Sequence, residues 1–164
     1  MKKKHDERNL TMVMDLYEMT MANGYFADGD MERRVAFDVF YRRNPDQAGF
    51  SIFAGLSQVV EYIENLHFDP EDIEYFRSLS LFSEEFLAYL SDFSFRGDVY
   101  AFPEGTIMYP DEPIITVVAP LIDAQMVETA ILLEINHQSL IATKARRIVR
   151  AAQGRAVSDF GARR

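Results

Sequence analysis

Residues 120–143 read PLIDAQMVETAILLEINHQSLIAT and mark a change in the character of the chain. At 3.6 residues per turn, apolar residues such as Met126, Ile131 and Leu133 fall on nearly every side of a helix. A helix that is apolar all round is typical of a protein interior. We therefore expect a buried helix over about 121–143, opened by Pro120.

The residues before this stretch mix helical and strand patterns. Between Gly97 and Ala119, short apolar runs are separated by turn residues, which predicts a small sheet. The spacing of apolar and capping residues predicts further elements upstream: a helix over 15–25, strands over 34–41 and 50–54, a helix over 56–66, and helices that start after Asp69 and Ser83. The order indicates a mixed α and β protein.

The residues after the stretch predict a helix that leads into a strand. A basic helix is expected to continue to Gln153 and to end at Gly154, because glycine is common just past a helix C-terminus. Ala156–Phe160 is predicted to be a strand, and glycine and paired arginines follow it. This pattern is typical of a ligand-binding strand end. We expect the chain to be the front part of an enzyme, interrupted within its active site.

Composition limits the class of protein. With 164 residues, the chain can form one domain with a real core, or one domain and part of another. It has no cysteine, which excludes disulfides and thiolate metal sites and suits a cytoplasmic location. The basic start lacks a following apolar core, so we expect no signal peptide, and no apolar run approaches membrane-spanning length.

Charge is unevenly distributed along a chain whose net charge is -9. Residues 144–164 carry seven basic side chains and only one acidic side chain, Asp159. A globally acidic protein is a poor general binder of nucleic acid, whereas a local basic end suits a small ligand that bears phosphate. The alternative is that Arg146, Arg147 and Arg150 simply face solvent on a helix.

Common catalytic and metal-binding motifs are missing from the sequence. Asp159-Phe160-Gly161 resembles a protein-kinase motif, but the glycine-rich loop and the His-Arg-Asp that a kinase requires are absent. The three histidines are isolated and lack the spacing of metal ligands. We therefore predict no catalytic residue and no metal ligand from these motifs.

Three segments together resemble nicotinate phosphoribosyltransferase. The first is DLYEMTMANGY over 15–25, which alone would be an amphipathic helix whose tyrosines belong to the core. The second runs from Gly105 through Glu112-Pro113-Ile114, Gln125 and Glu128-Thr129 to LIATKA over 140–145. The third is DFGARR over 159–164. The resemblance extends from about Leu10 to Arg164.

The resemblance implies a fold and a reaction. The fold is an N-terminal α+β domain followed by the start of an irregular α/β barrel, as in type II phosphoribosyltransferases, with the domains at 1–120 and 121–164. The reaction makes nicotinate mononucleotide from nicotinate and phosphoribosyl pyrophosphate, with ATP hydrolysis and magnesium, in NAD biosynthesis. The implied assembly is a homodimer with shared active sites, and the fragment alone is expected to be inactive.

The resemblance also implies which residues bind substrate. Phe160 would stack on one face of nicotinate, and Tyr17, supplied by the neighbouring subunit, would cover the other. Arg163 would grip a carboxylate or phosphate with its planar fork. Arg164 would hold phosphoribosyl oxygens, and Asp15 would orient an arginine or the pyridine end.

Two alternatives stay open. The chain could be a non-catalytic truncated subunit or an oligomerisation module. It could also be a nicotinamide or quinolinate phosphoribosyltransferase of the same architecture.

Overall fold

Three antiparallel strands form the main sheet in this computed structural model, which describes residues 9–161. The order is β1 (Arg34–Phe40), β5 (Pro113–Pro120) and β3 (Asp98–Ala101), so β5 lies in the centre. β2 (Ser51–Ile52) and β4 (Ile107–Met108) pair in a second, two-stranded sheet. β5 is buried over most of its length, because strands flank it on both sides and helices cover it.

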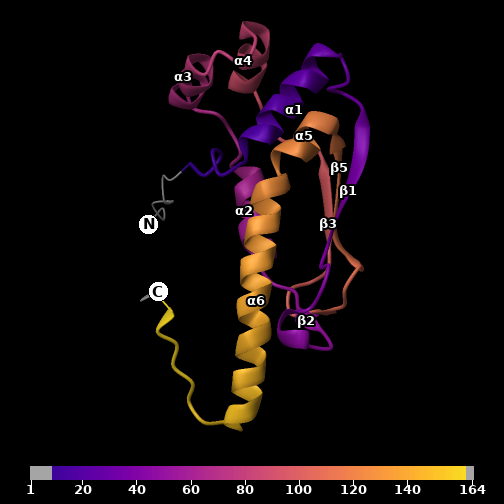
Figure 1. The fold of residues 1–164 in the computed structure, drawn as a ribbon, viewed down its shortest axis with the longest axis vertical. Helices are drawn as coiled ribbons and strands as arrows, with labels where there is room; N and C mark the ends of the chain where they lie inside the picture. The colour runs from indigo at the N-terminus through magenta and orange to yellow at the C-terminus, as the bar shows by residue number, and fades with distance from the viewer. Residues whose placement is uncertain (1–8, 162–164) are drawn as a thin grey trace, which may run out of the picture.

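The helices lie to one side of the main sheet, and the longest of them runs along most of the length of the molecule (Figure 1). They are α1 (Leu16–Ala27), α2 (Leu56–Glu64), α3 (Pro70–Ser78), α4 (Glu84–Ser91), α5 (Leu121–Met126) and α6 (Glu128–Ala152), with a short 3-10 turn at Pro45–Gln47. α1 and α5 pack together at one end of the sheet, and α2 packs along α6. The described chain is therefore a mixture of helices and antiparallel strands, which agrees with the α+β prediction for its first part.

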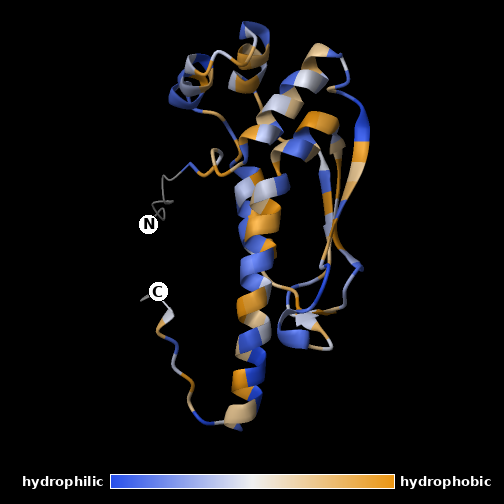
Figure 2. Ribbon diagram, viewed as in Figure 1, coloured by the Kyte–Doolittle hydropathy of each residue, from blue (hydrophilic) through white to orange (hydrophobic). Residues whose placement is uncertain are grey.

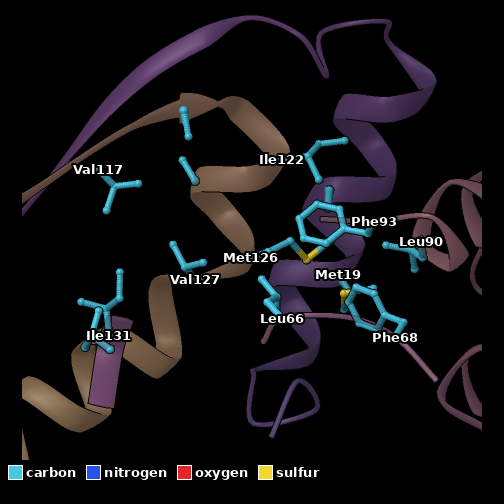
Figure 3. Close-up of a cluster of buried hydrophobic side chains, with 14 of the residues drawn as sticks. Met19, Leu66, Phe68, Leu90, Phe93, Val117, Ile122, Met126, Val127 and Ile131 are labelled. Carbon is cyan, nitrogen blue, oxygen red and sulfur yellow. The ribbon is translucent and has the colours of Figure 1, made fainter. Parts of the chain in front are cut away.

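One hydrophobic core joins these elements (Figure 3). Met19 of α1 lies in it with Ile122 and Met126 of α5, and the cluster continues to Val117 of β5 and Ile131 of α6. β5 runs directly into α5 at residue 120, and both contribute to this core. The division of the chain into domains at residue 120 stays a prediction.

The stretch after Pro120 differs from the expected single buried helix. It breaks at Val127, whose φ of -105° and ψ of -2° separate α5 from α6. α5 is buried throughout, but Leu133 and Ile141 of α6 are 51% and 53% exposed. The prediction of burial all round is wrong for α6 because, within residues 9–161, its contacts lie along the side that faces α2 and β2. Figure 2 shows apolar bands along this helix.

The chain after α6 also differs from the prediction. Residues 155–160 are exposed and form no strand, so the predicted strand over 156–160 is wrong for the described chain. A strand requires a partner for its backbone N–H and C=O groups, and the segment runs apart from both sheets (Figure 1). The start of an α/β barrel consequently stays a prediction. In the part of the chain that the structure describes, no helix is long and apolar enough to cross a membrane.

Candidate functional site

The first turn of α1 contains two of the predicted site residues, Asp15 and Tyr17. Asp15 is the N-cap residue of α1 and forms a capping box with Glu18. In this arrangement the Asp15 backbone N–H donates to Glu18 Oε2 at 3.2 Å. The box satisfies backbone groups that a helix start leaves unpaired, and it therefore fixes where α1 begins.

Tyr17 projects from this turn with its ring partly open to solvent. The residue is 44% exposed, and its hydroxyl donates to Glu128 Oε1 at 2.9 Å. The other oxygen of that carboxylate, Oε2, accepts from Gln125 Nε2 at 2.9 Å. Desolvation, followed by the hydrogen bond to Glu128, raises the pKa of Tyr17 to about 12. The phenol is therefore neutral at physiological pH and acts as a hydrogen-bond donor.

Glu18 is fully buried and connects α1 to α6. Its Oε1 accepts from the backbone N–H of Thr129 at 2.8 Å, in the first turn of α6. Burial raises the pKa of the Glu18 carboxyl, although the hydrogen bonds from Thr129 and Asp15 act in the opposite direction. Glu18 thus satisfies backbone groups at the starts of two helices and sets their relative position.

Sequence reasoning missed Glu18, Gln125 and Glu128 as members of this cluster. The spacing Asp15-x-x-Glu18 is that of a capping box, which is a local signal for Glu18. The contact between Tyr17 and Glu128 joins residues 111 positions apart and has no local signal.

The remaining predicted residues lie in the segment that follows α6 or outside the described chain. Phe160 is 68% exposed in the segment that follows α6. Figure 1 shows this segment away from α1, so the structure brings Asp15 close to Tyr17 but does not bring Phe160 to either of them in one chain. Arg163 and Arg164 lie outside the described residues.

The basic residues of α6 mostly face solvent, as the simpler reading of the sequence proposed. Arg146 and Arg150 are exposed. Lys144 and Arg147 pair with Asp46, at 3.2 and 3.5 Å.

Two cavities lie beside the start of α6. One, of about 410 Å³, lies between the main sheet and the α5–α6 junction, and Asp38, Val117 and Glu128 contribute to its wall. The other, of about 810 Å³, is lined by residues of the segment before α1, of α2 and the loop that follows it, and of α6, and contains none of the predicted site residues. The smaller cavity is thus adjacent to the carboxylate that holds Tyr17.

Acidic and histidine side chains do not gather into a metal centre among residues 9–161. No group of three or more such side chains is placed to hold an ion there.

Comparison with known proteins places the chain in a family. A model of the nicotinate phosphoribosyltransferase N-terminal domain matches residues 12–136. The nicotinate phosphoribosyltransferase pncB2 of Mycobacterium tuberculosis is 49% identical over 150 residues, which cover 92% of this chain and 32% of that protein. The nicotinate phosphoribosyltransferase of Bacillus subtilis is 41% identical, over 95% of this chain and 32% of its own length.

One solved structure agrees with this assignment, and a second shares the fold. Human nicotinic acid phosphoribosyltransferase superimposes with a TM-score of 0.79 and 31% identity, over 88% of this chain and 29% of that chain. The structure of nicotinate-nucleotide pyrophosphorylase from Pyrococcus furiosus shares the fold, with a TM-score of 0.69 and 24% identity. The match covers 98% of this chain and 35% of that chain. The chain spans about a third of the length of the curated relatives it matches. On the match over residues 12–136 and these identities, the chain belongs to the nicotinate phosphoribosyltransferase family.

Proposed function

We propose that the protein carrying this chain is a nicotinate phosphoribosyltransferase of NAD biosynthesis. The reaction joins the ring nitrogen of nicotinate to the anomeric carbon of phosphoribosyl pyrophosphate and releases pyrophosphate. The 49% identity to the Mycobacterium tuberculosis enzyme over 92% of the chain supports this proposal most strongly.

The exposed ring of Tyr17 supports a role in binding a flat substrate. Its hydroxyl is held by Glu128 while part of the ring faces solvent. An aromatic ring held in this way can stack on the electron-poor ring of nicotinate, a contact worth about 0.5–1.5 kcal/mol beyond area burial. Because Tyr17 and Phe160 lie apart in one chain, we propose that each site takes Tyr17 from one subunit of a homodimer and Phe160 from the other.

The arginines after Phe160 complete the proposed site. Arg163 offers a planar fork that can hold a carboxylate or phosphate by two parallel hydrogen bonds. Arg164 is proposed to hold phosphoribosyl oxygens. Asp15 is proposed to orient an arginine or the pyridine end from its N-cap position.

Catalysis in such a site depends on position and charge. Displacement at the anomeric carbon passes through a cationic sugar while pyrophosphate leaves with its negative charge. Holding the ring nitrogen close to that carbon and stabilising the leaving group therefore supply most of the rate enhancement. ATP hydrolysis and magnesium are proposed for the whole protein, but the described residues gather no metal ligands and we assign them no step through either.

A direct assay tests the proposal. The intact protein is incubated with phosphoribosyl pyrophosphate and nicotinate, nicotinamide or quinolinate, with and without ATP, and the mononucleotide is quantified. We expect nicotinate mononucleotide, with more product when ATP is hydrolysed. A preference for nicotinamide or quinolinate would instead support a related transferase, and no product from any of them would support a non-catalytic subunit.

Two further expectations concern the fragment and its location. Residues 1–164 alone are expected to show no turnover in the same assay. Cell fractionation should place the intact protein in the cytoplasm.

A further inference from the structure

Glu128 connects the exposed Tyr17 ring to the buried part of the molecule. It is the first residue of α6, where a negative charge is favourable because of the helix dipole. Oε1 accepts from the Tyr17 hydroxyl and Oε2 accepts from Gln125 Nε2, both at 2.9 Å. Gln125 is itself almost completely buried in α5. Both oxygens of the carboxylate are therefore engaged, one on the buried side and one on the exposed side.

Glu18, the other carboxylate of the cluster, has a different role from Glu128. Its oxygens accept from the backbone N–H groups of Thr129 and Asp15. It therefore fixes the starts of two helices, whereas Glu128 is the acceptor for the tyrosine side chain. Without a partner for its hydroxyl, a half-exposed tyrosine could adopt several rotamers, and ordering it upon binding a ligand would cost free energy.

We propose that Glu128, itself held by Gln125, is a positioning residue that presents the ring of Tyr17 to the nicotinate ring. This inference rests on the proposed function, in which Tyr17 covers one face of nicotinate. Preorganisation of the ring lowers the entropy that substrate binding must offset. The negative charge on Glu128 also disfavours a substrate carboxylate near the tyrosine hydroxyl, so the nicotinate carboxylate should point away from it.

The kinetic test compares single and double variants of the intact protein. Glu128→Ala and Tyr17→Phe should each raise the KM for nicotinate about three- to tenfold, as expected for the loss of one hydrogen bond. The KM for phosphoribosyl pyrophosphate should change little. Because both changes remove the same contact, the double variant should be no worse than either single variant. Glu128→Gln retains an oxygen acceptor and should recover most of the loss.

Glu85→Ala is the matched control, since it removes an exposed carboxylate from the first turn of α4. It should leave the KM for nicotinate unchanged. Normal nicotinate kinetics in Glu128→Ala, or additive effects in the double variant, would overturn the inference.

A spectroscopic test separates this inference from the proposed function. The protein is labelled with 3-fluorotyrosine, and the Tyr17 fluorine signal is assigned by its loss in Tyr17→Phe. We expect this signal to titrate at lower pH in Glu128→Ala than in the wild type, and equal midpoints would overturn the inference. If no nicotinate is converted, the proposed function fails, while this titration still decides whether Glu128 holds Tyr17.

Discussion

Asp123 is a carboxylate with no solvent exposure, and its hydrogen bonds show how a buried charge is tolerated here. Its Oδ2 accepts from the backbone N–H of Arg96 at 2.8 Å, and its Oδ1 accepts from Arg96 Nη2 at 3.0 Å. The same guanidinium pairs with Glu32 at 2.9 Å through Nη1. Because an unpaired buried charge is strongly unfavourable, loss of Arg96 should destabilise the fold strongly.

Arg96→Met is expected to lower the free energy of unfolding by about 3 kcal/mol, the lower end of the range of about 3–5 kcal/mol measured when one partner of a buried ion pair is removed. Arg77→Met is the matched control, since Arg77 pairs with Glu74 and Glu84 at the surface. That change should have little effect because exposed pairs contribute little. Urea unfolding of both variants checks the prediction, and equal losses would contradict it.

The buried carboxyl of Glu18 should make stability depend on pH. Burial raises its pKa above the ordinary value of 4.5, so the folded protein keeps this proton to a higher pH than the unfolded chain does. The stabilisation from that proton is complete below about pH 4.5 and is lost as pH rises through the folded pKa.

Glu18→Gln cannot lose a proton, so its stability relative to the wild type should increase as pH rises from about 4 to 7. Replacing one carboxylate oxygen by an NH₂ group also removes a hydrogen-bond acceptor, which shifts the stability of the variant by an amount that does not depend on pH. The test is therefore how the difference in stability between the two proteins changes with pH. Melting temperatures of both proteins across this range provide the measurement. A constant difference would mean that the carboxyl titrates alike in the folded and unfolded states.

At the scale of elements, local sequence signals predicted where helices start. Long-range packing decided which helix faces are buried and which segments form strands. Asp69 and Ser83 are the N-cap residues of α3 and α4, as predicted, because capping depends on neighbouring residues only. The break at Val127 and the missing strand over 156–160 had no such signal. A strand exists only with a partner, and burial of α6 depends on what packs against it.

The same limit applies to the candidate site. The sequence indicated Asp15 and Tyr17 through their resemblance to a family, and the structure places them together in the first turn of α1. It contained Glu128 in the resemblance but could not indicate its contact with Tyr17, because that contact depends on how α1 meets the α5–α6 junction. The roles of the substrate-binding residues stay predictions.

Two glycines test how closely the elements pack. A Cβ atom at Gly97 would lie 2.5 Å from the Cβ atom of Ala119, where β3 approaches β5, whereas nothing lies within 4 Å at Gly24 in α1. Gly97→Ala should therefore destabilise the fold by about 1–3 kcal/mol through overpacking. Gly24→Ala should stabilise it by about 0.5–1 kcal/mol, because alanine favours helices. Melting temperatures of the two variants provide the measurement. If both temperatures rose or both fell, the predicted difference in packing at the two glycines would be wrong.

At the scale of the whole molecule, the proposed nicotinate site depends on residues that lie far apart along the chain. Tyr17 meets the first residue of α6, whereas Phe160 and the paired arginines follow its other end. At about 1.5 Å per residue, the 25 residues of α6 span roughly 37 Å. In the proposed two-fold dimer, the first turn of α1 in one subunit meets the DFGARR segment of the other, and the symmetry repeats this arrangement twice.

Activity of mixed dimers tests most directly whether each site combines Tyr17 of one subunit with Arg163 of the other. In intact protein, Tyr17→Ala and Arg163→Ala are each expected to abolish most nicotinate transfer. A dimer with one subunit of each kind has one site with both lesions and one with neither, so proven subunit exchange should restore up to about half of the wild-type activity per mixed dimer. If exchange occurs and no activity returns, Tyr17 does not reach across to its neighbour, and the shared nicotinate site is wrong.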